Sequence, residues 1–306
     1  MGLKQRPLWP NTLKMQAMAK PEFVWLNEEL LPLDQARVSV DDRGFLYGDG
    51  FFETLRVEEG RPWFLKEHLT RLAASARAFR LPFPEKFPWD DALTRLLIAN
   101  GLMKQVAAVK IILTRGAAPD LGLPLPGSPT LVLRARPYTP PSPEEYDQGW
   151  PVVVFPERRT TFLGSHKSLN YLFYLAARQY ALDRGAREAL VLEADGLISE
   201  GAATSLVLLI KERFFTPLAP SALPGVTLAV LGRALQKKGE LLEAVPLIPA
   251  QLEEVQALWL ANSLMGLMPV ASLDGRPLRR APDAGRFLRN CLMAEFQEQT
   301  RLPLEP

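Results

Sequence analysis

Lys167 is the residue of this sequence that is best suited to covalent chemistry. It follows Gly164-Ser165-His166 and precedes an apolar stretch with helical spacing over residues 168–184, so we expect it at the start of a helix. The helix dipole disfavours a cation there, which lowers the pKa of the ammonium group and favours the neutral amine that a Schiff base requires. A surface lysine that tolerates a small penalty is the alternative, and position alone favours that alternative.

A carboxylate and a helix start are two further features with chemical potential. Glu200 ends an expected strand and is followed by the small residues 201–203, a setting in which a carboxylate can pair with a protonated pyridine nitrogen. Residues 223–227 form a turn into a helix, where backbone N–H groups bind phosphate, and Thr227 adds a hydroxyl. Taken singly, a solvated glutamate and an ordinary helix start are the alternatives.

Arg71 is a third candidate, on a helix that follows an expected β-hairpin. Its guanidinium can bind a phosphate through two parallel hydrogen bonds, although an exposed arginine in a salt bridge is the more common case. His68 lies three residues earlier on the same helix. It could serve as a base, but we expect a packing or hydrogen-bonding role for this lone histidine.

The composition excludes several classes of site. The chain has 306 residues, a formal net charge of +2 and 47% hydrophobic residues, which is ordinary for a globular protein and offers no basic patch for nucleic acid. One cysteine excludes an internal disulfide, and two histidines are too few for a histidine-rich metal site. A cofactor that needs neither residue type fits this inventory better.

The chain also lacks the pattern of a membrane protein. No apolar run approaches the roughly 20 residues of a membrane span, and the basic stretch over residues 1–20 lacks the apolar centre of a secretory signal. We expect residues 1–20 to be an N-terminal extension and the protein to be cytoplasmic, without a membrane partner.

Helical and strand patterns alternate along the chain without a strict βαβ rhythm, which predicts a mixed α/β fold. Strands are expected at residues 23–26, 37–40, 52–57, 61–65, 106–114, 130–136, 151–155, 188–194, 197–199, 205–210 and 257–261. Helices are expected at residues 66–80, 89–98, 168–184, 226–238 and 283–297. Four prolines over residues 137–149 indicate a linker. We therefore predict a smaller N-terminal α/β domain (21–137), a linker (138–149) and a larger C-terminal domain (150–306).

Five blocks in this order resemble the fold-type IV pyridoxal-phosphate enzymes, also known as class IV aminotransferases. This family includes branched-chain aminotransferases, D-amino-acid aminotransferases and 4-amino-4-deoxychorismate lyases. The blocks are Asp42 to Thr54, His68 to Leu72, Lys167 to Asn170, Glu200-Gly201, and Leu223 to Thr227. One such block is weak evidence, but five in family order reverse the preference for a surface lysine at position 167.

The resemblance implies pyridoxal phosphate as cofactor and assigns residues to it. Lys167 resembles the lysine that forms the Schiff base and shuttles protons, and Glu200 resembles the partner of the pyridine nitrogen. The phosphate is then expected to be held by Arg71, Val226, Thr227 and Ser263. The cofactor would lie between the two domains of a homodimer whose partner chain helps to line the site.

Two positions depart from the family pattern, and one family role has two candidate residues. Ser205 stands where many members have asparagine, and Leu228 stands where many have arginine. Tyr171 and Tyr47 are both candidates for the tyrosine that often contacts the phenolic oxygen of the cofactor. A cofactor-free structural or binding dimer is the non-enzyme alternative, and the presence of the lysine argues against it.

Within the family, the segment Asn262 to Gly266 and the segment Gly48 to Thr54 look most like aminodeoxychorismate lyase. The strand over residues 109–116 lacks the Arg-x-His pattern common in D-amino-acid aminotransferases. The resemblance thus implies a lyase that converts the small molecule 4-amino-4-deoxychorismate to 4-aminobenzoate and pyruvate in folate biosynthesis. A branched-chain or D-amino-acid aminotransferase is the alternative.

Overall fold

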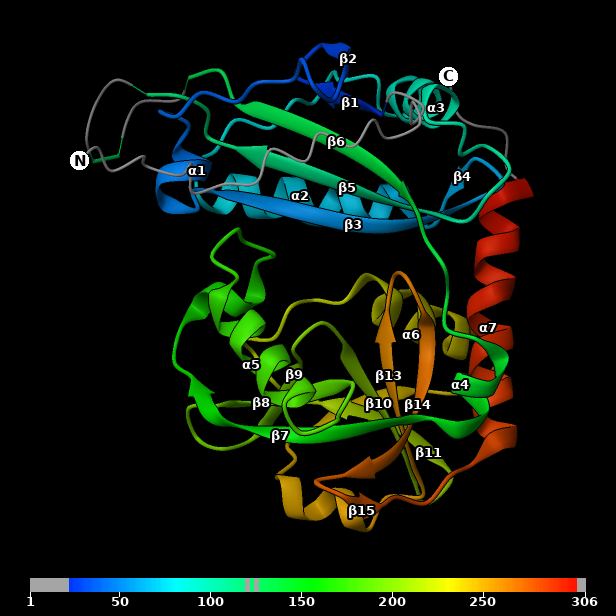
Figure 1. The fold of residues 1–306 in the computed structure, drawn as a ribbon. Coiled ribbons are helices and arrows are strands. Elements are labelled where there is room, and N and C mark those ends of the chain that lie inside the picture. The colour runs from blue at the N-terminus through cyan, green and yellow to red at the C-terminus, as the bar shows by residue number, and fades with distance from the viewer. Residues whose placement is uncertain (1–21, 119–121, 124–126, 302–306) are drawn as a thin grey trace, which may run out of the picture.

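The computed structural model describes residues 22–118, 122–123 and 127–301, arranged as two β-sheets with helices packed on both (Figure 1). The predicted mixed α/β fold is confirmed. The predicted extension, residues 1–20, lies outside the described residues. Within the described residues, no helix is both long and apolar enough to span a membrane.

The first sheet has six antiparallel strands in the order β2-β1-β6-β5-β3-β4. The strands are β1 (Phe23–Leu26), β2 (Glu29–Pro32), β3 (Gly50–Glu58), β4 (Arg61–Pro62), β5 (Ala107–Thr114) and β6 (Thr130–Pro137). Three helices accompany them, namely α1 (Arg43–Tyr47), α2 (Leu65–Ala78) and α3 (Trp89–Ala99).

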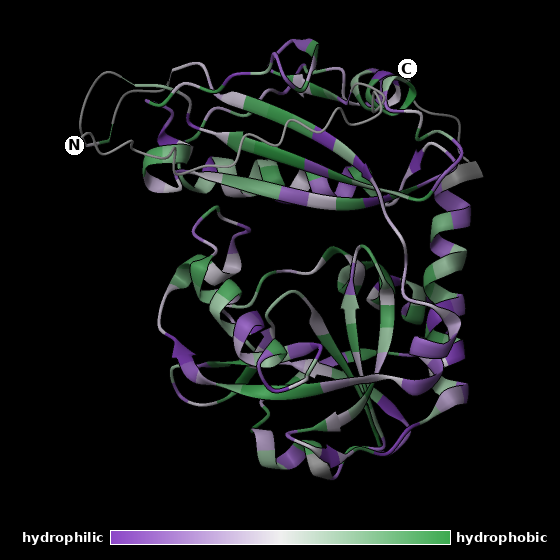
Figure 2. Ribbon diagram, in the orientation of Figure 1, coloured by the Kyte–Doolittle hydropathy of each residue, from purple (hydrophilic) through white to green (hydrophobic). Residues whose placement is uncertain are grey.

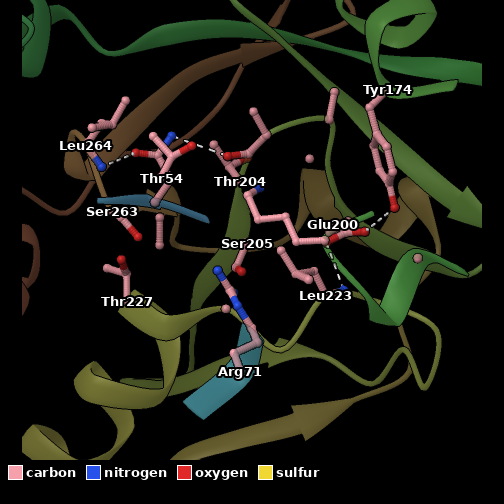
Figure 3. Close-up of a pocket in the computed structure, with 18 of the residues that line it drawn as sticks. Thr54, Arg71, Tyr174, Glu200, Thr204, Ser205, Leu223, Thr227, Ser263 and Leu264 are labelled. Carbon is pink, nitrogen blue, oxygen red and sulfur yellow. Dashed lines mark hydrogen bonds between the residues drawn. The ribbon is translucent and has the colours of Figure 1, made fainter. Parts of the chain in front are cut away.

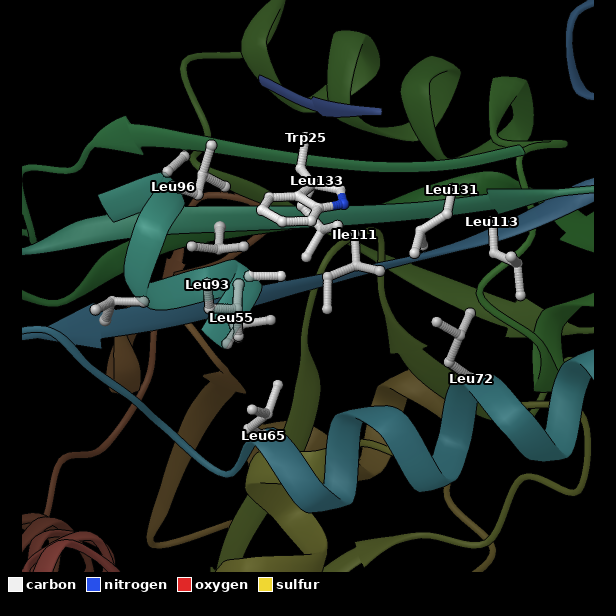
Figure 4. Close-up of a cluster of buried hydrophobic side chains, with 14 of the residues drawn as sticks. Trp25, Leu55, Leu65, Leu72, Leu93, Leu96, Ile111, Leu113, Leu131 and Leu133 are labelled. Carbon is white, nitrogen blue, oxygen red and sulfur yellow. The ribbon is translucent and has the colours of Figure 1, made fainter. Parts of the chain in front are cut away.

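The two faces of this sheet have different functions. Leu55 of β3 packs with Leu72 of α2 and Leu96 of α3 in one apolar core (Figure 4). Because side chains alternate along a strand, Phe52 and Thr54 point away from that core, and both line a pocket between the sheets. The alternation of β3 therefore supplies a core on one face and a site wall on the other.

The second sheet has nine strands, eight of them in the order β12-β11-β10-β13-β14-β7-β8-β9, with β15 paired to β14. They are β7 (Trp150–Arg159), β8 (Glu188–Glu193), β9 (Ile198–Gly201), β10 (Ser205–Ile210), β11 (Arg213–Pro217), β12 (Leu242–Val245), β13 (Ala257–Asn262), β14 (Gly266–Leu273) and β15 (Arg276–Pro277). The helices are α4 (Pro143–Gln148), α5 (Leu172–Leu182), α6 (Val226–Lys237) and α7 (Pro282–Arg301), with short 3-10 turns at Phe162–Ser165 and Pro249–Glu253.

The second sheet is rolled around a core of its own. Val152 of β7, Leu190 of β8 and Leu206 of β10 belong to one buried cluster. Helices α4, α5, α6 and α7 contribute no buried residue to this cluster among those described. Helices α6 and α7 bury a second cluster on the outer face, and α5 buries a third. Figure 2 shows hydrophobic residues gathered in the strands of both sheets.

Helix α7 joins the two halves of the molecule (Figure 1). The ring of Phe296 on α7 stacks on Trp63 beside β4, with ring centroids 4.4 Å apart. Val226 and Val230 of α6 complete this buried cluster. The cluster holds the first sheet against α6. It therefore fixes the relative position of residues on the facing sides of the two sheets.

Three sequence expectations need comment. No strand forms at residues 37–40, because Val38 and Val40 are exposed and their alternation marks no buried face. The helix predicted from residue 168 begins only at Leu172. The predicted linker contains α4, whose start is stabilised by a capping box between Ser142 and Glu145.

Candidate active site

A cavity of about 220 Å³ lies between the two sheets (Figure 3). The first sheet and α2 contribute Phe52, Thr54 and Arg71 to its wall. Of the residues predicted from the sequence, five line the cavity: Arg71, Lys167, Glu200, Thr227 and Ser263. The structure therefore brings together residues that are separated by up to about two thirds of the chain.

Lys167 lies in a turn after the 3-10 turn Phe162–Ser165, next to an isolated bridge between Ser168 and Phe51 of β3, and not at a helix start. The backbone N–H of Phe52 donates to its carbonyl at 2.9 Å, and Leu169 donates to Gly50 at 3.0 Å. Its Nζ lies 4.7 Å from the centre of the Phe52 ring and 5.6 Å from that of Tyr171. The lysine is thus fixed by the sheet, and aromatic rings surround its amine.

The pKa of Lys167 is lowered to about 8, and burial is the main cause. The positive charge of Arg71 lowers it further, while the carboxylates of Glu53 and Glu200 oppose the shift. The expected direction was correct, but its expected cause, a helix dipole, was wrong because the helix begins five residues later. Desolvation between the two sheets makes the neutral amine accessible near neutral pH.

Glu200 lies on β9 with both of its oxygens hydrogen-bonded. Oε1 accepts from Arg159 at 2.5 Å. Oε1 also accepts from the Tyr174 hydroxyl at 3.0 Å, and Oε2 accepts from the Leu223 N–H at 3.1 Å (Figure 3). Burial raises the pKa of Glu200 to about 6, although Arg159 opposes the rise. The carboxylate is therefore positioned rigidly and remains able to share a proton with a ligand.

Arg159 is a site residue that the sequence analysis missed. Its side chain is buried, and besides Glu200 it donates to Glu193 and to the Ser199 hydroxyl, each at 2.5 Å. In the sequence it follows Glu157 and Arg158 and resembles an ordinary charged surface segment. Only its position under β9 shows that it holds Glu200.

Arg71 is bound to a second buried carboxylate, that of Glu53 on β3. Its Nε and Nη2 donate to the two oxygens of Glu53 at 2.8 and 2.6 Å, and its Nη1 donates to the Pro224 carbonyl at 2.8 Å. Burial alone would raise the pKa of Glu53, but hydrogen bonds from His68 and Arg71 outweigh it and lower the pKa to about 2. Glu53 is therefore ionised and keeps Arg71 against the turn before α6.

His68 extends this network to Ser263. Its Nδ1 lies 2.7 Å from Glu53 and its Nε2 lies 3.2 Å from the Ser263 hydroxyl. The imidazole ring therefore bridges the carboxylate of Glu53 and the hydroxyl of Ser263 through its two nitrogens. The expected hydrogen-bonding role is thus correct, and the three-residue spacing from Arg71 was the available signal, since it places both side chains on one helix face.

The start of α6 forms the wall of the cavity opposite Glu200 (Figure 3). Thr227 is buried, and its hydroxyl makes no hydrogen bond within the described chain. A Cβ on Gly225 would lie 2.4 Å from the Ser205 hydroxyl, so only glycine allows that approach. Val226 does not line the cavity, because its side chain packs with Trp63 and Phe64. Only its backbone N–H can face a ligand.

The other residues singled out from the sequence lie as follows. Tyr171 lines the cavity and donates to the Ala202 carbonyl at 3.1 Å, and burial raises its pKa to about 12. Tyr47 is exposed on α1, and Leu228 packs on an apolar cluster. Among the described residues, no group of histidine, cysteine and acidic side chains could hold a metal ion.

A sequence model of the family "Amino-transferase class IV" matches residues 50–273. The bifunctional aminodeoxychorismate lyase and D-amino acid transaminase of Mycobacterium tuberculosis is 30% identical over 281 residues, which cover 86% of this chain and 95% of that protein. Branched-chain-amino-acid aminotransferase-like protein 2 of Arabidopsis thaliana is 29% identical over 284 residues, 88% of this chain. The matched part covers 50% of the length of that plant protein.

Solved structures agree with this relationship. A proposed 4-amino-4-deoxychorismate lyase from Legionella pneumophila has a TM-score of 0.78 and 28% identity, covering 85% of this chain and 96% of its own. A hypothetical aminotransferase from M. tuberculosis, in its pyridoxal-phosphate-bound form, has a TM-score of 0.78 and 26% identity, covering 90% and 99%. With the family match extending over more than half of the chain, this protein belongs to the class IV aminotransferase family.

Proposed function

We propose that this protein is a pyridoxal-phosphate enzyme in which Lys167 carries the covalent link to the cofactor. The cavity supports this proposal by its donor set. It combines a buried lysine whose pKa is lowered, a buried carboxylate, and a cluster of hydroxyl, guanidinium and backbone N–H groups. These groups match the aldehyde, the pyridine nitrogen and the phosphate of pyridoxal phosphate in turn.

The phosphate is assigned to the start of α6. The unpartnered Thr227 hydroxyl, the backbone N–H groups of the first turn and the dipole of a helix of 12 residues favour an anion there. Arg71 and Ser263 border the same space. Because Glu53 and His68 already hold these two side chains, little ordering remains when a phosphate binds.

Glu200 is assigned to the pyridine nitrogen. A carboxylate that is buried and held by Arg159 and Tyr174 can accept a hydrogen bond from a protonated ring nitrogen without moving. When bound, the cofactor supplies an electron sink for the carbon that bears the substrate amine. The Lys167 amine, buried beside that carbon, would be the base that removes its proton.

For the reaction, we propose the aminodeoxychorismate lyase activity, with release of pyruvate and formation of 4-aminobenzoate. The position of Lys110 supports the lyase over an aminotransferase. It pairs with Thr54 in the sheet register, so it projects from the same face as Phe52 and Thr54, and its Nζ lies 4.6 Å from the centre of the Phe52 ring. Lys110 is exposed and makes no ion pair among the described residues, and partial desolvation lowers its pKa.

A free ammonium beside the reacting lysine favours a substrate with a second carboxylate over one with an apolar side chain. Aminodeoxychorismate carries two carboxylates, whereas a branched-chain amino acid would place its aliphatic group near this charge. The lyase activity of the bifunctional relative supports the same choice. An aminotransferase acting on D-amino acids is the remaining alternative, because it shares the first proton transfer.

We also propose that the protein acts as a homodimer. Large apolar side chains are exposed on α1 and near the cavity, among them Phe45, Leu46, Phe162 and Leu172. Exposed apolar side chains of this size are typical of a protein interface when they lie together. Light scattering of the purified protein should give the mass of two chains, and a single-chain mass at micromolar concentration would contradict this assignment.

The lysine assignment predicts a specific covalent adduct. After incubation with pyridoxal phosphate and reduction by borohydride, the wild-type protein should keep one cofactor through denaturation, as detected by mass spectrometry. Lys167→Ala should lose this adduct. Lys110→Ala is the matched control, because the Lys110 Nζ lies at nearly the same distance from the Phe52 ring, 4.6 Å, and its loss should leave the adduct intact. An adduct that survives in Lys167→Ala would refute the assignment.

The lowered pKa of Lys167 predicts how cofactor capture depends on pH. Only the neutral amine attacks the aldehyde, and with a pKa of about 8 the neutral fraction rises with pH through this value. The capture rate of cofactor-free protein should therefore increase about tenfold between about pH 7 and pH 9 and then level off. Stopped-flow absorbance measures it. A rate that keeps rising tenfold per pH unit up to pH 10 would indicate an unperturbed lysine.

The choice of reaction predicts the product. The holoenzyme supplied with 4-amino-4-deoxychorismate and no keto acid should release pyruvate, detected by coupled lactate dehydrogenase, together with 4-aminobenzoate. Lys110→Ala should raise KM at least several-fold with a smaller effect on kcat. If amino transfer requires an added keto acid and no pyruvate appears, the aminotransferase alternative replaces the lyase, while the cofactor assignments stand.

A further inference from the structure

A second cavity, of about 330 Å³, lies outside the candidate active site. It is formed where the start of α7 meets α4 and the strands β13 and β14 (Figure 1). Its most distinctive lining residues are Trp259, Gly285 and four arginines, Arg279, Arg280, Arg286 and Arg289. None of these residues lines the cavity between the sheets.

The charge of this cavity is strongly positive. Asp147 is the acidic residue among its described lining residues, and its backbone carbonyl, not its carboxylate, accepts a hydrogen bond from Arg280. Arg286 is paired with Asp283 on the same helix. Arg279 and Arg289 make no hydrogen bond or ion pair within the described residues. At least two guanidinium groups are therefore available to an anion.

The indole N–H of Trp259 points to a ligand. Its side chain is only 2% exposed, and its indole N–H finds no acceptor among the described residues. The indole nitrogens of Trp63 and Trp150 also lack partners, but they are sealed by protein, whereas Trp259 borders the cavity. A buried indole nitrogen can only donate, so an acceptor in the cavity is what it lacks.

Gly285 keeps the space next to this donor open. A Cβ at this position would lie 3.0 Å from the Trp259 Nε1 and 3.5 Å from an Arg289 Nη1. Glycine within a helix is unfavourable compared with alanine, and here it stands in the first turn of α7, a helix of 20 residues. The missing side chain therefore leaves room for a ligand atom between the indole, the guanidinium and the positive end of the helix dipole.

We propose that this cavity binds the phosphate group of a small phosphorylated compound. A phosphate offers several acceptor oxygens in a tetrahedral arrangement and up to two negative charges, which match an indole N–H, free guanidinium groups and a helix start. A single carboxylate would leave most of these donors unused. The proposal does not depend on the reaction at Lys167, because the two cavities share no lining residue.

The test follows the indole resonance of Trp259 in a ¹H–¹⁵N spectrum of the ¹⁵N-labelled holoenzyme. The sequence has six tryptophans, and Trp259→Phe identifies the resonance. Inorganic phosphate should shift it saturably, and sodium chloride at equal ionic strength should not. Glycerol 3-phosphate should produce the same saturable shift and compete with phosphate. Use of the cofactor-loaded protein keeps the phosphate position near α6 filled.

Variants distinguish a specific phosphate site from a non-specific effect of positive charge. Arg279→Met removes an exposed guanidinium without partners, so it should not disturb folding, and it should weaken phosphate binding several-fold. The double variant Arg279→Met with Arg289→Met should weaken it at least tenfold. Gly285→Ala should abolish the shift while the resonance itself persists. Arg213→Met, an exposed arginine on β11, is the matched control and should bind as the wild type does.

Three results would overturn the proposal. The first is the absence of a saturable phosphate shift at Trp259. The second is equal weakening by Arg213→Met and Arg279→Met, which would indicate a non-specific charge effect. The third is a shift with inorganic phosphate that glycerol 3-phosphate neither reproduces nor competes with, which would exclude a phosphorylated compound as the ligand.

Discussion

The pairing of the buried Glu53 carboxylate is the interaction on which the site depends. An ionised carboxylate in the interior is stable only when opposite charge and hydrogen bonds surround it, and here His68 and Arg71 satisfy both oxygens. Those two residues in turn contact Ser263 and the Pro224 carbonyl on the second sheet's side. One carboxylate on β3 therefore positions α2 against two turns of the other half of the molecule.

Burial in the gap between the sheets acts differently on three of its ionisable groups. Glu53 is surrounded by donors, so its pKa falls despite burial, whereas burial prevails at Glu200 and raises its pKa to about 6. At Lys167 burial disfavours the cation and lowers the pKa to about 8. The result is an ionised carboxylate at Glu53, a carboxylate at Glu200 that is able to share a proton, and an amine at Lys167 with a pKa of about 8.

Much of this could be predicted because the relevant sequence signals are local. Lys167, Glu200 and Thr227 each lie in a short contiguous block, and most helices and strands follow from hydrophobic spacing over neighbouring residues. The prediction failed where one local sequence pattern is compatible with two structures, a helix or a segment paired with a strand. The segment after Lys167 has helical spacing, but its first residues pair with β3 because the backbone of Gly50 and Phe52 is available there.

The sequence by itself determined the family and the mixed α/β fold, and it pointed to the lysine and the carboxylate that fold into one cavity, because these features depend on residue type and on order along the chain. The tertiary structure decided which side chains position these residues and shift their pKa values. Arg159 reaches Glu200 across 41 residues, and His68 reaches Ser263 across 195. In the sequence each of these partners resembles an ordinary polar residue. Their hydrogen bonds become strong only when folding excludes water from between the two sheets.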